Sequence, residues 1–176
     1  LPVYIGIRGF LEDISKQVLI YDWRAPISSV FYDFEKGTAH YKAPKGSIIG
    51  ELLLKRQYKT NHDTLEYMIE SSVSVDDEIL QKELSSTSDE KMKNIVATIQ
   101  KEQNAIIRNE DAHVLIIQGA AGSGKTSIAL HRIAFMLYRF KHTIQSSDML
   151  VLSPNKVFSD YISNVLPELG EDNIQE

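Results

Sequence analysis

The pattern of hydrophobic and polar positions changes character twice along the chain. Residues 1–72 alternate short β-prone runs, such as VYIGIRGF, QVLIYDW and ELLLKRQYKT, with turn-forming residues. The stretch SSVFYDFEKGTAHYKAP predicts a hairpin that turns at residues 35–38. Several short strands at this spacing predict a small antiparallel sheet or barrel, so residues 1–72 form a β-rich region in this interpretation.

From about residue 73 the apolar positions recur at helical spacing. Asp76 and Asp77 lie where a helix N-terminus favours negative charge. After the polar break SSTSDE, a stronger helical pattern carries Met92, Ile95, Val96, Ile99 and Ile106. Residues 73–112 are therefore expected to form a helical connector.

The last third of the chain predicts alternating strands and helices. HVLIIQG (113–119) has the composition of a strand buried in a parallel sheet, and a helix is predicted over residues 125–140. A second strand, MLVLS, and a helix over residues 156–166 follow. Because crossover connections are right-handed, the two strands should be parallel, and the fold class should be α/β.

The loop between the first of these strands and its helix carries the clearest chemistry. Residues 119–126 match G-x-x-x-x-G-K-[ST], in which glycines let successive backbone N–H groups point at phosphate oxygens. Lys125 should reach the β- and γ-phosphates, and the Thr126 hydroxyl should ligate Mg²⁺. The alternative is a glycine-rich turn without a ligand, but the strand-loop-helix context favours a nucleotide site. The expected nucleotide contacts are Gly119, Ala120, Ala121, Gly122, Ser123, Gly124, Lys125, Thr126 and Ser127.

Other polar residues have two interpretations each. Gln103 could present its amide to an adenine, but glutamine is also common on exposed helix faces, which spacing alone favours. Ser153, Asn155 and Lys156 could hold a phosphate backbone or form a turn and helix start. Trp23, the only tryptophan, ends an apolar run and is expected in the core.

The residues after the loop do not supply the rest of a hydrolytic site. Hydrolysis also needs an acid that holds Mg²⁺, a group that positions water and usually an arginine finger. The carboxylates of Asp160, Glu168, Glu171, Asp172 and Glu176 lie in or after the last predicted helix. We therefore expect a fragment of a larger ATPase that is inactive by itself.

Charge and composition narrow the function classes. The net charge is −5, and the surplus is concentrated in residues 76–112, with five basic against nine acidic side chains. The chain thus carries no basic stripe typical of an autonomous nucleic-acid binder. No apolar run approaches the roughly 20 residues that span a bilayer, so no membrane association is expected. The chain has no cysteine, which fits a cytoplasmic location.

The motifs together resemble a known family. EQNAIIR, GAAGSGKTSIALHRIAF and VLSPNK resemble the Q motif, motif I and motif Ia of superfamily 1 helicases of the UvrD/Rep/PcrA group. YDWRAPISSVFY, KRQY and IVATIQKEQNAIIR are similar to HelD-type proteins, which are helicase-like ATPases associated with bacterial RNA polymerase and often described as DNA helicase IV-like.

This resemblance implies a fold, cofactors and partners. Residues 113–176 would be the N-terminal part of a RecA-like P-loop NTPase domain that binds ATP and Mg²⁺. Gln103 would contact the adenine, and Arg132 would belong to the nucleotide pocket. Ser153, Asn155 and Lys156 would contact nucleic acid. Bacterial RNA polymerase is the implied partner, and single-stranded DNA is a second one.

Three functions follow from the sequence. The first is an ATP-dependent factor that remodels or recycles RNA polymerase, and the second is a DNA helicase or translocase in repair. The third treats the β-rich region as a protein-docking module and the nucleotide site as a sensor. The DWRAP stretch favours the first, because the resemblance implies that simple repair helicases lack it at this position.

Overall fold

Within the described residues, all strands lie between residues 5 and 70. The computed structural model describes residues 1–34, 36–61, 64–70, 101–152 and 169. A three-stranded sheet has the order β1 (Ile5–Gly6), β3 (Val18–Asp22), β2 (Phe10–Leu11). Strand β1 is parallel to β3, and β2 is antiparallel to it. The expected β-rich region is confirmed, although one pair of strands is parallel.

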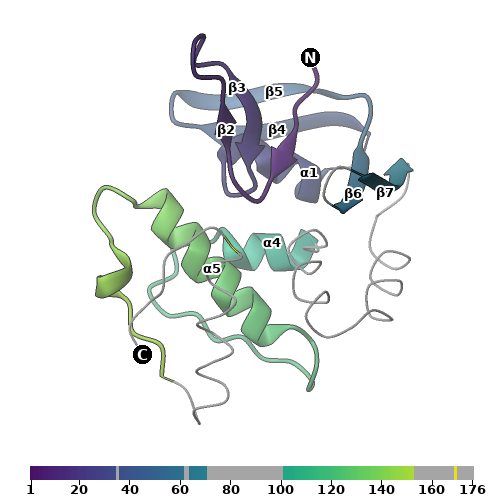
Figure 1. Ribbon diagram of the computed structural model, residues 1–176. Coiled ribbons are helices and arrows are strands. Elements are labelled where there is room, and N and C mark those ends of the chain that lie inside the picture. The colour runs from purple at the N-terminus through teal and green to yellow at the C-terminus, as the bar shows by residue number, and fades with distance from the viewer. Residues whose placement is uncertain (35, 62–63, 71–100, 153–168, 170–176) are drawn as a thin grey trace.

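Two antiparallel hairpins follow this sheet (Figure 1). Strand β4 (Gly37–Ala43) pairs with β5 (Gly46–Leu52), and β6 (Arg56–Asn61) pairs with β7 (Thr64–Glu70). The first hairpin turns after Ala43, where Ala43 opposes Gly46, and Gly46 has a φ of +128° that suits glycine. The hairpin predicted to turn at residues 35–38 is therefore wrong, because that segment leads into β4.

The residues before β4 are helical instead of extended. A 3₁₀ turn, η1 (Pro26–Ser28), runs directly into α1 (Ser29–Asp33). Pro26 begins the turn with a preset φ, and the Ser28 hydroxyl donates to the carbonyl of Asp22 at 2.7 Å. These local bonds, together with the packing of α1 on a later helix, override the β preference of Val30, Phe31 and Tyr32.

Two helices carry the core of the described residues. Helix α4 (Lys101–Ile107) lies in the predicted connector, and α5 (Lys125–Arg139) confirms the helix predicted after the loop. The buried positions of α5 recur every three or four residues, so one face packs inward. The core joins this face to Trp23 and to α4, and its members are Trp23, Ile107, Ile128, Leu130, Ala134, Phe135, Leu137 and Leu169.

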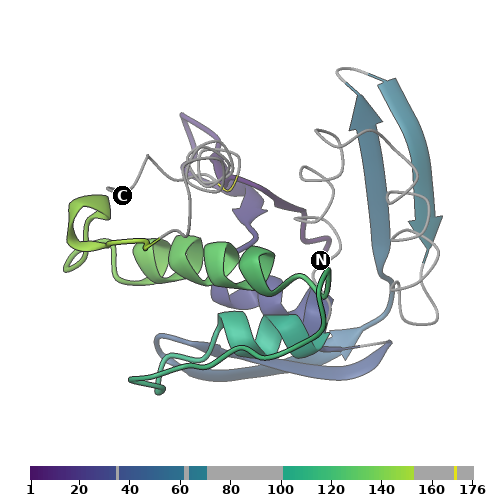
Figure 2. The same cartoon turned by 90° about the horizontal axis from the view of Figure 1, so that it is seen from below.

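Figures 1 and 2 show how these parts meet. Strands β1 to β5 lie at the top of Figure 1, α4 and α5 lie below them, and α1 lies between. The β6–β7 hairpin lies to the right of α1 in the same view. The view from below shows α4 and α5 side by side, in agreement with their packing contacts. The α/β class is confirmed, and Trp23 of DWRAP (residues 22–26) belongs to the same core as residues of α4 and α5.

The parallel strands expected around the loop are not formed in the described residues. Residues 113–119 are irregular, and residues 149–152 contain only a single bridge residue, Leu150. A strand exists only when a neighbour pairs with it, and only some of the apolar side chains here are covered, with Ile117, Met149 and Val151 packed on the core. Val114, Ile116, Leu150 and Leu152 are 67–86% exposed. The prediction of two strands is wrong for these segments, and the expected helix over 156–166 lies outside the described residues.

Candidate nucleotide-binding site

The glycine-rich loop enters α5 through two left-handed glycines. Gly122 and Gly124 have φ values of +80° and +79°, which strain any residue with a Cβ. Gly119 has a different reason to be glycine, since a Cβ there would lie 2.6 Å from the Ser123 hydroxyl oxygen. Gly124 is also the N-cap of α5 and has no side chain to accept from the first-turn N–H groups. A phosphate fits this helix N-terminus.

Lys125 folds back across the loop. Its ammonium donates to the carbonyl oxygens of Gly119 at 2.9 Å and Ala120 at 2.5 Å. A phosphate oxygen would have to replace these acceptors, so the lysine is already at the loop but bound to backbone. Ala121 and Ser123 are exposed, while Thr126 and Ser127 are half-buried in the first turn of α5.

Gln103 lies against the loop. Its side-chain nitrogen is 3.6 Å from the position that a Cβ on Gly124 would occupy. Helix α4 therefore brings the glutamine to the N-terminus of α5, across 21 positions of sequence (124 − 103). A surface role for Gln103 predicts an exposed side chain, whereas contact with an adenine predicts a side chain beside the loop. Its half-buried position beside the loop is compatible with contact to a base bound there.

Arg132 connects α5 to the end of α4. Its Nη1 donates to the carbonyl oxygens of Ile106 at 3.0 Å, Ile107 at 3.4 Å and Asn109 at 2.5 Å. These are carbonyls at and just after the C-terminus of α4, which a cation stabilises. In this structure Arg132 thus anchors the helix that carries Gln103.

His131, on α5, is buried where this helix faces the DWRAP turn. Its Nδ1 lies 2.7 Å from the carbonyl oxygen of Ser127, and its ring meets that of Trp23 edge-on at 5.4 Å. Because a carbonyl only accepts, Nδ1 carries the proton and Nε2 is an acceptor. Burial lowers the pKa of His131 from 6.5 to about 4, more than the hydrogen bond to Ser127 raises it. The histidine is a packed neutral residue, as its position on the helix predicts.

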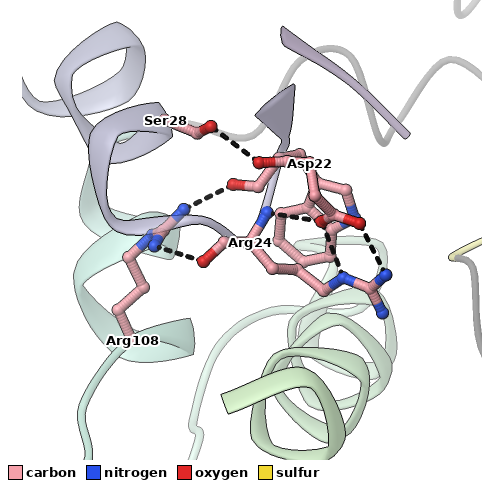
Figure 3. Close-up of polar contacts among 5 residues, drawn as sticks. Asp22, Arg24, Ser28 and Arg108 are labelled. Carbon is pink, nitrogen blue, oxygen red and sulfur yellow. Dashed lines mark hydrogen bonds and ion pairs between the residues drawn. The ribbon is translucent and has the colours of Figure 1, made fainter. Parts of the chain in front are cut away.

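DWRAP forms a tight polar turn with a buried ion pair (Figure 3). Arg24 binds Asp22 through two side-chain bonds of 2.8 Å and one backbone bond of 2.9 Å. Both residues are less than 10% exposed. The guanidinium of Arg24 also lies 4.8 Å from the ring centre of Tyr138 on α5. This contact holds the turn against α5.

Arg108 attaches this turn to α4. Its guanidinium donates to the carbonyl oxygens of Trp23 at 2.6 Å, Arg24 at 3.1 Å and Ala25 at 3.4 Å. Burial lowers the pKa of Arg108, although Tyr32 and the carboxylates of Asp33 and Asp22 act in the other direction. Burial likewise raises the pKa of Tyr32 to about 12, and Arg108 opposes this rise.

No role for Arg108 or its partner Asn104 is predicted from the sequence. Asn104 is 1% exposed, accepts from Arg108 at 2.9 Å and donates to Asp33 at 2.7 Å. The signal in the sequence is weak: an asparagine and an arginine lie four positions apart, with three apolar residues between them. Motif Ia, with Ser153, Asn155 and Lys156, lies outside the described residues. No group of metal-ligating side chains is present in the parts that the structure describes.

The family is visible in the region that contains the strands and DWRAP. A family model described as "DNA helicase IV HelD, N-terminal domain" matches residues 1–93, which is more than half of the chain. The chain belongs to the HelD family. The HelD match ends before α4, so the phosphate loop lies outside it. A search of curated proteins found no match. No described helix of this HelD family member is long and apolar enough to cross a membrane.

Proposed function

We propose that this chain is the nucleotide-binding part of an ATP-driven, helicase-like motor that remodels or recycles bacterial RNA polymerase. The observation that carries the nucleotide part is the placement of Gln103 beside Gly124 at the start of α5. A phosphate loop alone recognises only phosphates, whereas an amide beside it can also distinguish the base. The HelD family membership supports a helicase-related motor.

Each loop residue has one role in this proposal. The backbone N–H groups of residues 119–125 and the N-terminus of α5 hold the phosphates. Lys125 exchanges the carbonyls of Gly119 and Ala120 for phosphate oxygens. Thr126 would hold Mg²⁺, which neutralises phosphate charge when bound. Gln103 accepts from the adenine N6 amino group and donates to N7.

Nucleotide titrations of the full-length protein test the site. Guanine presents O6 where adenine presents an N6 donor, so it loses the match with Gln103. We expect ATP to bind more tightly than GTP, and Gln103→Ala to weaken ATP more than GTP. Lys125→Ala should weaken both nucleotides alike, because the phosphates are common to them.

The matched control is Gln17→Ala, in the exposed turn between β2 and β3. It should change neither affinity. Equal losses for ATP and GTP after Gln103→Ala would return Gln103 to a surface role, and unchanged binding after Lys125→Ala would contradict the phosphate site itself.

A DNA helicase or translocase is the second candidate function. The description of the matching family names a DNA helicase, and this favours nucleic acid as a partner. Co-purification of the full-length protein from bacterial lysate treated with nuclease separates the two. Recovery of RNA polymerase subunits by the wild-type protein supports the first function, and single-stranded-DNA-stimulated ATP hydrolysis without polymerase supports the second. Polymerase binding that is unchanged in Lys125→Ala, with no effect of ATP, favours a docking module instead.

A further inference from the structure

Contacts on two sides hold the described end of α4. Most helical stability in proteins comes from tertiary packing, and the described part of α4 spans Lys101–Ile107. Its placement therefore depends on the groups that bind it. On the side of α5, Arg132 donates to the carbonyl oxygens of Ile106 and Ile107, so the C-terminus of α4 is tied to the loop helix.

On its other side α4 is tied to the DWRAP turn and α1. Arg108 directly follows α4 and reaches three consecutive carbonyls, those of Trp23, Arg24 and Ala25. Figure 3 shows its guanidinium directed at the turn that contains Arg24. Its Nε also donates to Asn104, whose amide nitrogen donates to Asp33 at the end of α1. A partly buried side-chain network thus joins α4 to a segment about 80 positions earlier.

We propose that Arg108 is a positioning residue for base recognition. It fixes the position of α4 relative to the DWRAP turn, and with it the position of the Gln103 side chain beside Gly124. Gln103 is the immediate neighbour of Asn104 on α4, and Asn104 is bound by Arg108. A bidentate amide-to-base match weakens steeply with distance and angle. This inference rests on the proposed ATP site, and Arg108 acts through Gln103 without touching the nucleotide.

The network requires the shape of arginine as well as its charge. A guanidinium is planar and offers five N–H donors in a fixed fork, so it serves three carbonyls and Asn104 at once. A lysine ammonium keeps the charge but concentrates its donors at one point on a flexible stem. Arg108→Lys therefore preserves the positive charge and the nearby carboxylates while it loosens the link between α4 and the turn.

The test measures ATP and GTP affinity for the full-length wild-type protein, Arg108→Lys, Gln103→Ala and the double variant. Arg108→Lys should reduce the preference for ATP over GTP by about tenfold and change GTP affinity by less than about twofold. The double variant should show no further loss of preference beyond Gln103→Ala, because both changes remove the same contact. Arg139→Lys, at the exposed pair with Glu110, is the matched control and should leave the preference unchanged.

A purely structural role gives a different result. Equal weakening of ATP and GTP by Arg108→Lys, or an additive loss in the double variant, overturns the inference. If Arg108→Lys fails to fold, Asp33→Ala releases the same network from α1, and it must reduce the preference in the same direction. If the wild-type protein prefers ATP and these variants keep the same preference, the positioning role of Arg108 is wrong but the ATP site stands. Wild-type protein that binds neither nucleotide, or both alike, contradicts the proposed site as well.

Discussion

At the scale of single residues, His131 makes the stability of the chain depend on pH. Its neutral ring is buried, donates to the Ser127 carbonyl and has a pKa lowered by burial from 6.5 to about 4. Below pH 6.5 the unfolded chain takes up this proton while the folded chain does not, so the contribution present above pH 6.5 is lost as the pH falls towards 4. The loss should reach about 3 kcal/mol of unfolding free energy.

The measurement is urea unfolding of wild-type chain and His131→Phe at pH 7 and pH 4. Carboxylates also titrate in this range, so only the difference between the two proteins isolates the histidine. The variant should lose less stability than the wild type on acidification. Equal losses in the two proteins would mean that His131 is not the titrating group.

The main role of Trp23 should be packing in the core. It is 1% exposed, and its indole nitrogen and the Nε2 of His131 find no hydrogen-bond partner among the described residues. Trp23→Ala should destabilise the chain by about 3–5 kcal/mol, as large-to-alanine changes in cores do. Trp23→Phe keeps an aromatic ring in the core and removes the unpartnered N–H donor, so it should cost clearly less than Trp23→Ala. Thermal and urea unfolding followed by circular dichroism compares the two, and similar costs would show that the indole nitrogen has a role beyond packing.

At the scale of elements, the DWRAP turn depends on its buried ion pair. Loss of one charge of a buried pair typically costs about 3–5 kcal/mol. Asp22→Asn removes the charge of the carboxylate that accepts two bonds from the Arg24 side chain, so a loss towards that order is expected in urea unfolding. The control is Glu110→Gln, which breaks the largely exposed pair with Arg139 and should cost less than about 1 kcal/mol. Comparable losses in both would show that Arg24 reaches solvent once its partner is neutral.

The elements also show what a local pattern can predict. Helix α5 could be predicted from the sequence, because its apolar residues recur at helical spacing. It also follows a glycine-rich phosphate-loop motif, which leads into the N-terminus of a helix. Helix α1 does not, because Val30, Phe31 and Tyr32 favour strands and become helical through the Ser28–Asp22 bond and packing on α4. Residues 113–119 have the composition of a buried strand, yet a strand needs a paired neighbour, which composition cannot provide.

At the scale of the whole molecule, the site divides into a predictable part and a hidden one. The loop residues follow from a motif of fixed spacing, whose glycines at 122 and 124 have the left-handed φ that the motif requires. The contact that positions α4 and Gln103 could not be predicted from the sequence, because Arg108 and the carbonyl of Trp23 are 85 positions apart. No spacing rule predicts a bond between a side chain and a distant backbone oxygen. Such links emerge only when the β-rich region and the helices pack together.

The last expectation concerns catalysis by the chain as a unit. A phosphate loop positions a nucleotide, but rapid hydrolysis also needs an acid that holds Mg²⁺, a positioned water and usually an arginine finger, which alone is worth about 10³–10⁵ in rate. Near the helices, Asp22 binds Arg24, Asp33 binds Asn104, and Asp148 caps the 3₁₀ turn η3 (Ser146–Asp148). These acids are therefore engaged in structural bonds.

The 176-residue chain should accordingly hydrolyse ATP at least about a thousandfold more slowly than the roughly 10 per second of a median enzyme. Phosphate release from purified chain, measured beside Lys125→Ala to expose contaminating ATPases, checks this. The same preparations, titrated with ATP, show whether slow turnover reflects absent chemistry or absent binding. A turnover of about one per second or more that disappears in Lys125→Ala would show that the described acids, or residues outside the described ranges, complete a working site.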